Sequence, residues 1–299
     1  MTRPSVAVRA PDTSLIPAPY AGPGRVWQWM SIAAALIAAA GNIVGLTGLG
    51  DVYGRETDAF VNQALAQDII SLAVVSPAII VLALLASRGS MAAYLAWLGT
   101  MAFTVYNYVI YTLSLHAGAL FLPWIAVLGL SLFAVIGGLA ALDRHAVQAD
   151  FVRAPRRTAG WFLIIVAVAF AGLWLTDIIP ALLAGQVPSG ALELGLPSNP
   201  VHVLDLAFYL PATCAAGIGL LRHQAYGYAT APGLLIFLTL TGLPIMLTPL
   251  IASARGGTPA WAVLPPVAAV TIASLALAVR LLSSMVPTPD PVPTNATSP

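Results

Sequence analysis

The sequence predicts an all-α protein, a polytopic transmembrane helical bundle of about eight spans. Hydrophobic residues make up 59% of its 299 residues and charged residues only 8%, which gives a mean hydropathy of +0.90. A water-soluble domain needs more polar side chains than this to cover its surface. The apolar residues also gather in stretches of about 20, the length of helix that crosses a bilayer. We therefore expect the lipid bilayer to be the main partner of the chain.

Charge and cysteine content exclude several other classes of protein. The net charge is +1, so the chain lacks the basic excess of a nucleic-acid-binding surface. Cys214 is the single cysteine, which rules out an intramolecular disulfide and a CxxC redox pair. No motif in the sequence is typical of a catalytic, cofactor or metal site, and we predict none of these. The sequence identifies no protein partner.

The eight predicted spans fall into two groups of four. The first group covers residues 26–48, 68–86, 91–115 and 118–142. The second group covers residues 159–183, 201–221, 228–253 and 261–283. The two predicted four-helix units are therefore 26–142 and 159–284, joined by the Arg-rich segment 143–158. The ends, 1–25 and 285–299, are rich in Pro, Ser and Thr, which is typical of flexible tails.

The first span has an alternative interpretation as a cleaved signal peptide. Arginines precede it, and Ala38-Ala39-Ala40 resembles a small-residue cleavage site. However, the apolar run is longer than the roughly 7–15 residues of such a region. We therefore expect a retained membrane span.

The arginines predict which ends of the spans face the cytoplasm, because positive residues are retained on that side. If the N-terminus is cytoplasmic, only Arg55 and Arg255 fall on the outer side. The inner segments then carry Arg3, Arg9, Arg25, Arg88, Arg144, Arg153, Arg156, Arg157, Arg222 and Arg280. The complete lack of lysine is typical of a GC-rich bacterial gene. We predict a multi-pass protein of the bacterial inner membrane with both termini in the cytoplasm.

An internal duplication relates the two groups of spans. The same spacing recurs in Pro77, Arg88 and Gly99 of the first group and in Pro211, Arg222 and Gly233 of the second. An acidic residue precedes each proline, and Trp27 and Trp161 open the first and fifth spans. Since equivalent helices are an even number of spans apart, both halves have the same orientation. The pattern predicts a 4+4 parallel internal repeat about an axis along the membrane normal.

Glycine and proline inside the spans predict how the helices pack. Small residues one turn apart are typical of helices that approach closely, and the candidates are Gly41 with Gly45 and Gly137 with Ala141. Proline cannot donate a helical hydrogen bond, so it kinks a helix or marks the start of a cavity. The prolines concerned are Pro77, Pro211, Pro232 and Pro244.

Polar side chains inside the predicted spans are the main functional pointers, because a charge in hydrocarbon costs about 2.5–3.5 kcal/mol even on the mildest scale. Asp205 lies about 24 Å along a helix from Arg222, which places it just inside the outer leaflet. Asp177 precedes further apolar chain and is expected at a similar depth, with Asn42 at the matching place of the first span. Asp68 is expected at the outer edge.

The third span carries a polar stripe at helical spacing, formed by Thr100, Thr104, Asn107 and Tyr111 and flanked by Tyr106 and Tyr108. His116 and His202 lie near the outer ends of their helices. Asn199-Pro200 is typical of an N-cap followed by a first-turn proline, which puts His202 one turn before Asp205. We predict that several polar residues of the outer half line one outward-facing cavity. The candidates are Asn42, Asp68, Asn107, Tyr111, His116, Asp177, His202 and Asp205.

Each candidate also has a purely structural interpretation. Asp68 and Asp205 would cap helices or complement a helix dipole, Asp177 would lie in an exposed loop, and the tyrosines would be interface aromatics. His202 and Asp205 have the spacing of a metal pair or a proton relay. A bis-histidine haem held by His116 and His202 is geometrically conceivable. Neither a metal nor a haem is our prediction.

Several segments resemble a set of uncharacterised bacterial multi-pass integral membrane proteins. The segments are Tyr53-Gly54-Arg55-Glu56-Thr57, Gln67-Asp68, Ser87-Arg88-Gly89-Ser90 and Asn199-Pro200-Val201-His202-Val203-Leu204-Asp205-Leu206. The resemblance covers both halves of the chain. It implies a membrane protein and draws attention to the outer Asp and His residues, but that set has no known activity to carry over.

The sequence leads to three hypotheses about function. The first is a non-enzymatic transporter or permease-like protein for a small solute or ion, in which Asp177 and Asp205 bind a cation or exchange a proton. The second is an intramembrane enzyme acting on a lipid or a lipid-linked group through His202 and Asp205. The third is a scaffold or assembly subunit of a membrane complex. We favour the first because of the paired halves and the outer carboxylates.

Overall fold

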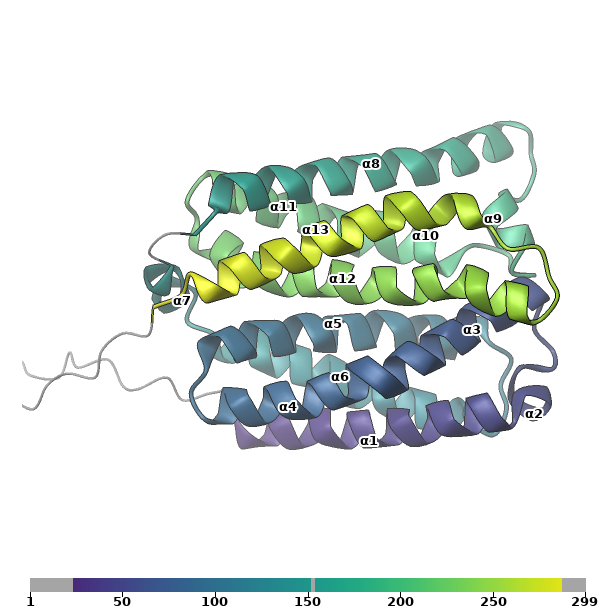
Figure 1. The fold of residues 1–299 in the computed structure, drawn as a ribbon, viewed down its shortest axis with the longest axis horizontal. Coiled ribbons are helices and arrows are strands. Elements are labelled where there is room, and N and C mark those ends of the chain that lie inside the picture. Colours follow the sequence, from purple (N-terminus) through teal and green to yellow (C-terminus); the bar gives the residue numbers. More distant parts are fainter. Residues whose placement is uncertain (1–23, 152–153, 287–299) are drawn as a thin grey trace, which may run out of the picture.

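The computed structural model describes residues 24–151 and 154–286 (Figure 1), and these residues form an all-helical bundle. Within these ranges the extended structure is limited to one isolated bridge between Phe151 and Met285. The prediction of an all-α chain is therefore confirmed. Most of the predicted flexible tails, 1–25 and 285–299, lies outside the described residues, as do Arg3, Arg9 and Arg153.

Seven helical stretches of the described chain are long and apolar enough to cross a membrane. In chain order these are α1 (Arg25–Thr47), α3 to α4 (Asp58–Ser87), α6 (Phe121–Ala141), α8 (Arg156–Leu183), α10 to α11 (Pro200–Leu221), α12 (Ala225–Ala254) and the stretch Trp261–Ser283, which ends in α13 (Leu264–Ser283). Their length and composition are those expected of a membrane protein. Most agree with the predicted spans to within a few residues, but the second begins at Asp58 and not at residue 68.

Three short helices lie in the connections between these stretches. They are α2 (Leu49–Tyr53), α7 (Arg144–Asp150) and α9 (Ser189–Leu192). The predicted Arg-rich linker 143–158 contains α7, which Asp143 caps by accepting hydrogen bonds from His145 N at 2.9 Å and Ala146 N at 3.2 Å. This linker is therefore partly helical.

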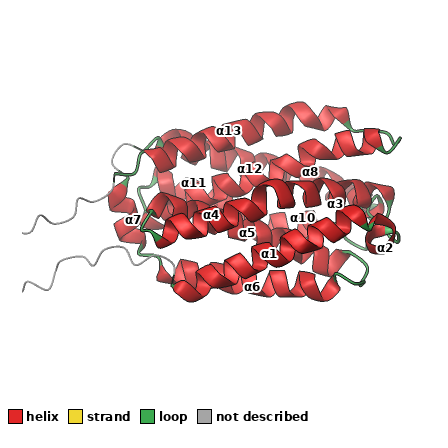
Figure 2. Cartoon of the chain, turned by 60° about the horizontal axis from the view of Figure 1, so that its bottom comes forward, coloured by secondary structure: helices red, strands yellow, loops and turns green. Residues whose placement is uncertain are grey.

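The third predicted span is the helix α5 (Met91–Ser114), which is 24 residues long but is not among the seven apolar stretches. Its Tyr, Thr and Asn residues make it less apolar than its neighbours. Most of the helix is nonetheless buried, and Trp97 and Tyr94 are fully so. It packs against α4, α6 and α12 (Figure 2). The polar stripe of α5 therefore faces other helices. The hydroxyls of Thr100 and Thr104 donate to carbonyls one turn earlier in α5 itself, Ala96 O and Thr100 O.

Two of the long stretches contain a π-helical segment, in which hydrogen bonds span five residues. In the second span this segment is η1 (Ser71–Val75), between α3 (Asp58–Ile70) and α4 (Ser76–Ser87). In the sixth span it is η2 (Asp205–Tyr209), between α10 (Pro200–Leu204) and α11 (Leu210–Leu221). Each segment ends two residues before a proline, Pro77 or Pro211, the residues at which the sequence predicts a kink or the start of a cavity.

The helices α5 and α12 cross closely at Gly99 and Gly233. A Cβ atom added to Gly99 would collide with the backbone oxygen of Gly233 and would lie 2.7 Å from its Cα atom. The two glycines were predicted to occupy equivalent places in the repeat, but the sequence did not predict that they touch. The predicted close approach of helix backbones is not found at Gly41, where nothing lies within 4 Å of the Cβ position. The atoms nearest to Gly45 and Gly137 are side-chain atoms, of Asp68 and Tyr53 in the first case and of Trp27 in the second.

The two ends of the bundle differ in charge. The start of α1, the end of α13, and the junctions α4–α5, α6–α7–α8 and α11–α12 lie together at one end (Figure 1). The described arginines of these segments are Arg25, Arg88, Arg144, Arg156, Arg157, Arg222 and Arg280. The opposite end carries Arg55 and Arg255, whose side chains contact Ala117 O and the Asp58 and Asn62 side chains. The two ends are therefore as asymmetric as the sequence predicts.

Candidate functional site

Asp68 is buried inside the first half of the bundle, with 1% of its surface exposed. The Tyr53 hydroxyl donates to its Oδ2 atom at 2.7 Å, and the Tyr111 hydroxyl donates to its Oδ1 atom at 2.9 Å. Asp68 does not start a helix, because Thr57 is the N-cap of α3. The interpretation of Asp68 as a helix cap is therefore wrong, and its carboxylate is instead held by two aromatic hydroxyls.

The surroundings of Asp68 are fitted closely around this arrangement. A Cβ atom on Gly45 of α1 would collide with Asp68 Oδ2 and lie 2.9 Å from the Tyr53 hydroxyl, so only glycine leaves room here. Burial raises the pKa of Tyr53 well above its usual value, and the nearby Asp68 raises it further. Tyr53 therefore keeps its proton and acts as a donor to the carboxylate.

Asp205 is the second buried carboxylate, with 7% of its surface exposed, and it begins η2. The Tyr106 hydroxyl of α5 donates to its Oδ1 atom at 3.0 Å, and the Trp174 Nε1 of α8 donates to its Oδ2 atom at 2.8 Å. Tyr106 belongs to the first predicted half and Trp174 to the second. The Asp205 carboxylate thus joins the two halves of the chain.

His202 and Asp177 are the two remaining candidates near Asp205, and both lie near the start of α9. The His202 ring packs on the Trp174 ring, with 4.6 Å between centroids. Asp177 accepts hydrogen bonds from Ser189 N at 3.0 Å, Ser189 Oγ at 2.7 Å and Gly190 N at 3.2 Å. Asp177 is partly exposed and lies inside α8, which continues to Leu183, so its interpretation as part of an exposed loop is wrong. Its carboxylate holds the start of α9.

The other three candidates form no hydrogen bond with these carboxylates. His116 is exposed, and both its backbone N and its Nδ1 lie 2.9 Å from Glu56 Oε1. Asn42 is buried, and its Nδ2 atom has no hydrogen-bond partner in the described part of the chain. Asn107 lines a small cavity beside η1. The His116 ring contacts Glu56, whereas the His202 ring packs on Trp174. The two histidines therefore do not form the bis-histidine haem site considered from the sequence.

The eight predicted residues therefore fall into separate groups. Asp68 and Tyr111 form one buried group, and Asp205, His202 and Asp177 surround Trp174 in another. Within residues 24–151 and 154–286, no cluster of three or more His, Cys, Asp and Glu side chains has the arrangement of a metal site. Asp68 and Asp205 are thus two buried carboxyl groups, and each accepts hydrogen bonds from two neutral donors.

Sequence reasoning missed the partners that hold the carboxylates. Tyr53 was noted only as part of a resembling segment and Tyr106 only as a neighbour of the polar stripe. Trp174 carried no signal, because an indole in an apolar span is usually a packing or interface residue. The polar stripe predicted that Tyr111 belongs to a polar helix face, but not that its hydroxyl donates to Asp68. Helical periodicity shows which residues share a face and not which residues that face contacts.

Comparison with known proteins gives no further guidance. No protein-family model matches the chain, and neither the curated proteins nor the solved structures include a significant match.

Proposed function

We propose that the chain is an eight-span protein of the bacterial inner membrane, built as two parallel four-helix repeats, that transports a small solute or ion. The described structure supports a membrane protein through its seven long apolar helices. The remaining steps of the proposal rest on α5, on the repeat and on Asp205.

The length and surroundings of α5 support an eighth span. At about 1.5 Å per residue its 24 residues extend about 36 Å, which exceeds the roughly 30 Å hydrocarbon core. Its polar residues are covered by α4, α6 and α12, and buried polar groups in a bundle avoid the cost of facing lipid. An even number of spans also accounts for α1 starting and α13 ending at the same end of the bundle (Figure 1).

The local structure supports the repeat. Both π-helical segments stand at the same distance from their prolines. A residue with positive φ follows two positions after the end of each next helix, Gly89 at 89° after α4 and His223 at 55° after α11. The same register pairs Tyr94 with Tyr228 and Phe103 with Phe237. Gly99 and Gly233, which are equivalent in this register, pack on each other where α5 crosses α12. Contact between equivalent residues is expected of two units related by a two-fold axis.

The observation that carries the proposal is Asp205 held between the halves. Transporters built from repeats commonly work by rocking one unit against the other around a central site. Such motion would break the bond from Tyr106 while keeping the bond from Trp174, so the exposure of Asp205 would change with the state of the protein. A π-helical segment at this residue supplies a weak point in the helix, and such segments are frequent at functional sites.

The segregation of arginines supports the proposed orientation. The arginine-bearing end of the bundle would face the cytoplasm, and the end with Arg55 and Arg255 would face outward. Both described ends of the chain, at α1 and α13, would then be cytoplasmic.

Replacement of Asp205 by asparagine tests the transport function. Purified protein is reconstituted in liposomes that contain a pH-sensitive dye, and an Na⁺ or K⁺ gradient is applied. We expect wild-type protein to drive a pH change and Asp205→Asn to slow it at least tenfold, since the amide can neither ionise nor release a proton. Asp177→Asn is the matched control, because Asp177 caps an exposed helix, and it should retain nearly full flux.

Two results would contradict the proposal. Wild-type liposomes that show no more flux than protein-free liposomes with either cation would exclude cation-coupled transport. A folded Asp205→Asn protein with wild-type flux would remove Asp205 from the mechanism. Folding is checked by the elution profile in detergent.

A further inference from the structure

The arginines at the two ends of the bundle differ in whether the chain itself holds them. Arg55 and Arg255 each donate to an oxygen atom of the described chain at 2.6 Å. At the other end, none of the seven described arginine side chains forms a hydrogen bond or a salt bridge with the described residues. Asp143 and Asp150 are the described acidic residues of that end, and Asp143 is used as the cap of α7. The arginine-bearing end therefore carries an excess of positive charge.

Three of these arginines lie where α8 meets α11. The two helices run antiparallel and touch at two glycines, since a Cβ atom on Gly217 would lie 2.6 Å from Gly160 O. Arg156 precedes Gly160 by one helical turn, about 6 Å, and Arg222 follows Gly217 by about 7.5 Å toward the same end of the bundle (Figure 1). Arg157 is the next residue of α8 and is exposed, as is Arg222. The crossing thus brings three guanidinium groups to one place.

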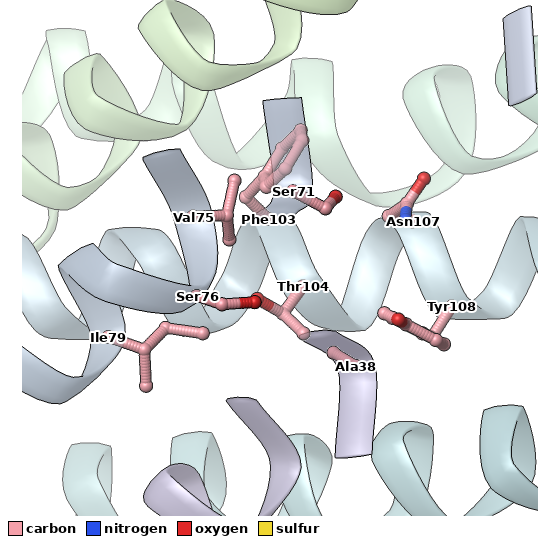
Figure 3. A pocket seen from close by; sticks show the side chains of 9 residues that line it. All are labelled: Ala38, Ser71, Val75, Ser76, Ile79, Phe103, Thr104, Asn107 and Tyr108. Carbon is pink, nitrogen blue, oxygen red and sulfur yellow. The ribbon is translucent and has the colours of Figure 1, made fainter. Parts of the chain in front are cut away.

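An apolar groove lies between the same two helices, farther from the arginine-bearing end. Its volume is about 180 Å³. The cavity beside η1 in the first half is much smaller (Figure 3), since its 10 Å³ is room for no more than one water. The lining of the groove includes Ala167, Val168 and Ala171 of α8 and Leu206, Leu210 and Cys214 of the stretch that continues into α11.

The groove opens at the lipid-facing surface, because Val168 at its edge is 62% exposed. Counted along the helices, it begins about 12 Å from Arg222 and about 16 Å from Arg156. Half of the hydrocarbon core is about 15 Å thick, so arginines at the edge of the core place the groove among the acyl chains. A cavity of roughly 150 Å³ with an apolar lining already binds a molecule of the size of benzene.

We propose that α8 and α11 bind one anionic phospholipid, with its phosphate at Arg156, Arg157 and Arg222 and an acyl chain in the groove. Guanidinium groups are always charged and donate paired hydrogen bonds that match the geometry of a phosphate. The positive excess selects a lipid of net negative charge. The groove selects a lipid over a free anion, because it contacts a chain that inorganic phosphate lacks. The binding depends neither on the proposed transport function nor on which leaflet contains the arginines.

Lipid binding is measured on the purified full-length protein in a neutral detergent, by native mass spectrometry and by thermal unfolding. Phosphatidylglycerol, phosphatidylcholine with the same acyl chains, and inorganic phosphate are the three probes. We expect phosphatidylglycerol to occupy one preferred site and to raise the Tm by roughly 3–6 °C. Phosphatidylcholine should bind roughly tenfold more weakly or less, because its choline cancels the charge of its phosphate. Inorganic phosphate should leave the Tm unchanged.

Two changes test the two parts of the site. Arg156→Gln with Arg222→Gln removes two of the phosphate ligands and should weaken phosphatidylglycerol binding roughly tenfold or more. Ala171→Leu places a larger side chain in the groove and should weaken the binding of both lipids. In the absence of lipid, the Tm of each variant should equal that of the wild type, because the arginines have no partner in the described chain and the groove has room for the leucine.

Each change has a matched control. Arg25→Gln with Arg88→Gln removes the same charge from the same end, but at the start of α1 and the end of α4 in the first half. Gly172→Leu adds a leucine at the residue next to Ala171, where nothing lies within 4 Å of the Cβ position. Both control proteins should keep wild-type binding of the first phosphatidylglycerol molecule.

Four results would overturn the proposal. Equal binding of the two lipids, or equal losses in the two double arginine variants, would indicate ordinary surrounding lipid or general charge attraction. An equal Tm rise with inorganic phosphate would indicate a site for a free anion. Wild-type binding by Ala171→Leu would exclude the groove. A selective phospholipid site in a protein without flux in liposomes would support this proposal and contradict the proposed function.

Discussion

Replacing Gly99 by alanine is expected to destabilise the protein by about 3 kcal/mol or more. The new Cβ atom would overlap the backbone oxygen of Gly233 and lie 2.8 Å from its carbonyl carbon. Backbone atoms cannot rotate away as a side chain can, so α5 and α12 would have to separate. Overpacking of a well-packed core typically costs about 1–3 kcal/mol, and here one methyl group disturbs the contact between the two halves.

The measurement is equilibrium unfolding in mixed detergent and SDS micelles, followed by circular dichroism. Gly129→Ala in α6 is the matched control, because nothing lies within 4 Å of its Cβ position. It should be neutral or slightly stabilising, since alanine is the better helix former by about 1 kcal/mol. Equal unfolding curves for Gly99→Ala and Gly129→Ala would contradict the close crossing of α5 and α12.

Replacing Tyr111 by phenylalanine is expected to cost about 1–3 kcal/mol of stability. The change removes one oxygen atom and leaves the shape of the side chain unaltered. Asp68 Oδ1 would lose its donor, the Tyr111 hydroxyl. Ala64 O, which lies 3.2 Å from the same hydroxyl, would lose this contact as well. A buried acceptor left without a partner carries its full desolvation cost, which is higher for a charged group.

The same unfolding assay tests this expectation. Tyr226→Phe is its control, since the Tyr226 hydroxyl has no hydrogen bond with the described residues. Tyr111→Phe should unfold more easily than wild type, and Tyr226→Phe should not. A Tyr111→Phe protein as stable as Tyr226→Phe would mean that the hydroxyl does not hold Asp68.

The helical spans were predictable from the sequence because membrane crossing demands long apolar runs, a requirement that does not depend on tertiary contacts. The start of the second span was the exception. Residues 58–67 contain Asn62, Gln67 and other polar side chains, so hydropathy does not mark them as helix. They are helical because Thr57 caps them and because α3 packs on α1 and α12.

The carboxylates of the candidate site were predictable, but their partners were not. Asp68 and Asp205 stand out in apolar chain, where a charge needs a reason. Which donor holds each one depends on how distant helices pack, and a single sequence does not contain that pairing. Asp177 looked equally significant, yet the chain turns back after α8 and Asp177 accepts hydrogen bonds from Ser189 N and Gly190 N at the start of α9. The spacing of residues along one helix does not show whether an Asp is held by distant helices, as Asp68 and Asp205 are, or by the next short helix, as Asp177 is.

The central claim is that the two halves lie parallel in the membrane, with the arginine-bearing end in the cytoplasm. Single cysteines in a Cys214→Ser background test it, using a membrane-impermeant maleimide on intact cells and on inverted vesicles. Ser90→Cys and Gln224→Cys occupy equivalent places at the starts of α5 and α12. Gly118→Cys and Gly257→Cys lie in connections at the opposite end.

The account predicts labelling of positions 90 and 224 only in inverted vesicles and of positions 118 and 257 only in intact cells. Labelling of positions 90 and 224 from opposite sides of the membrane would contradict the parallel repeat. Labelling of both from outside the cell would contradict the orientation.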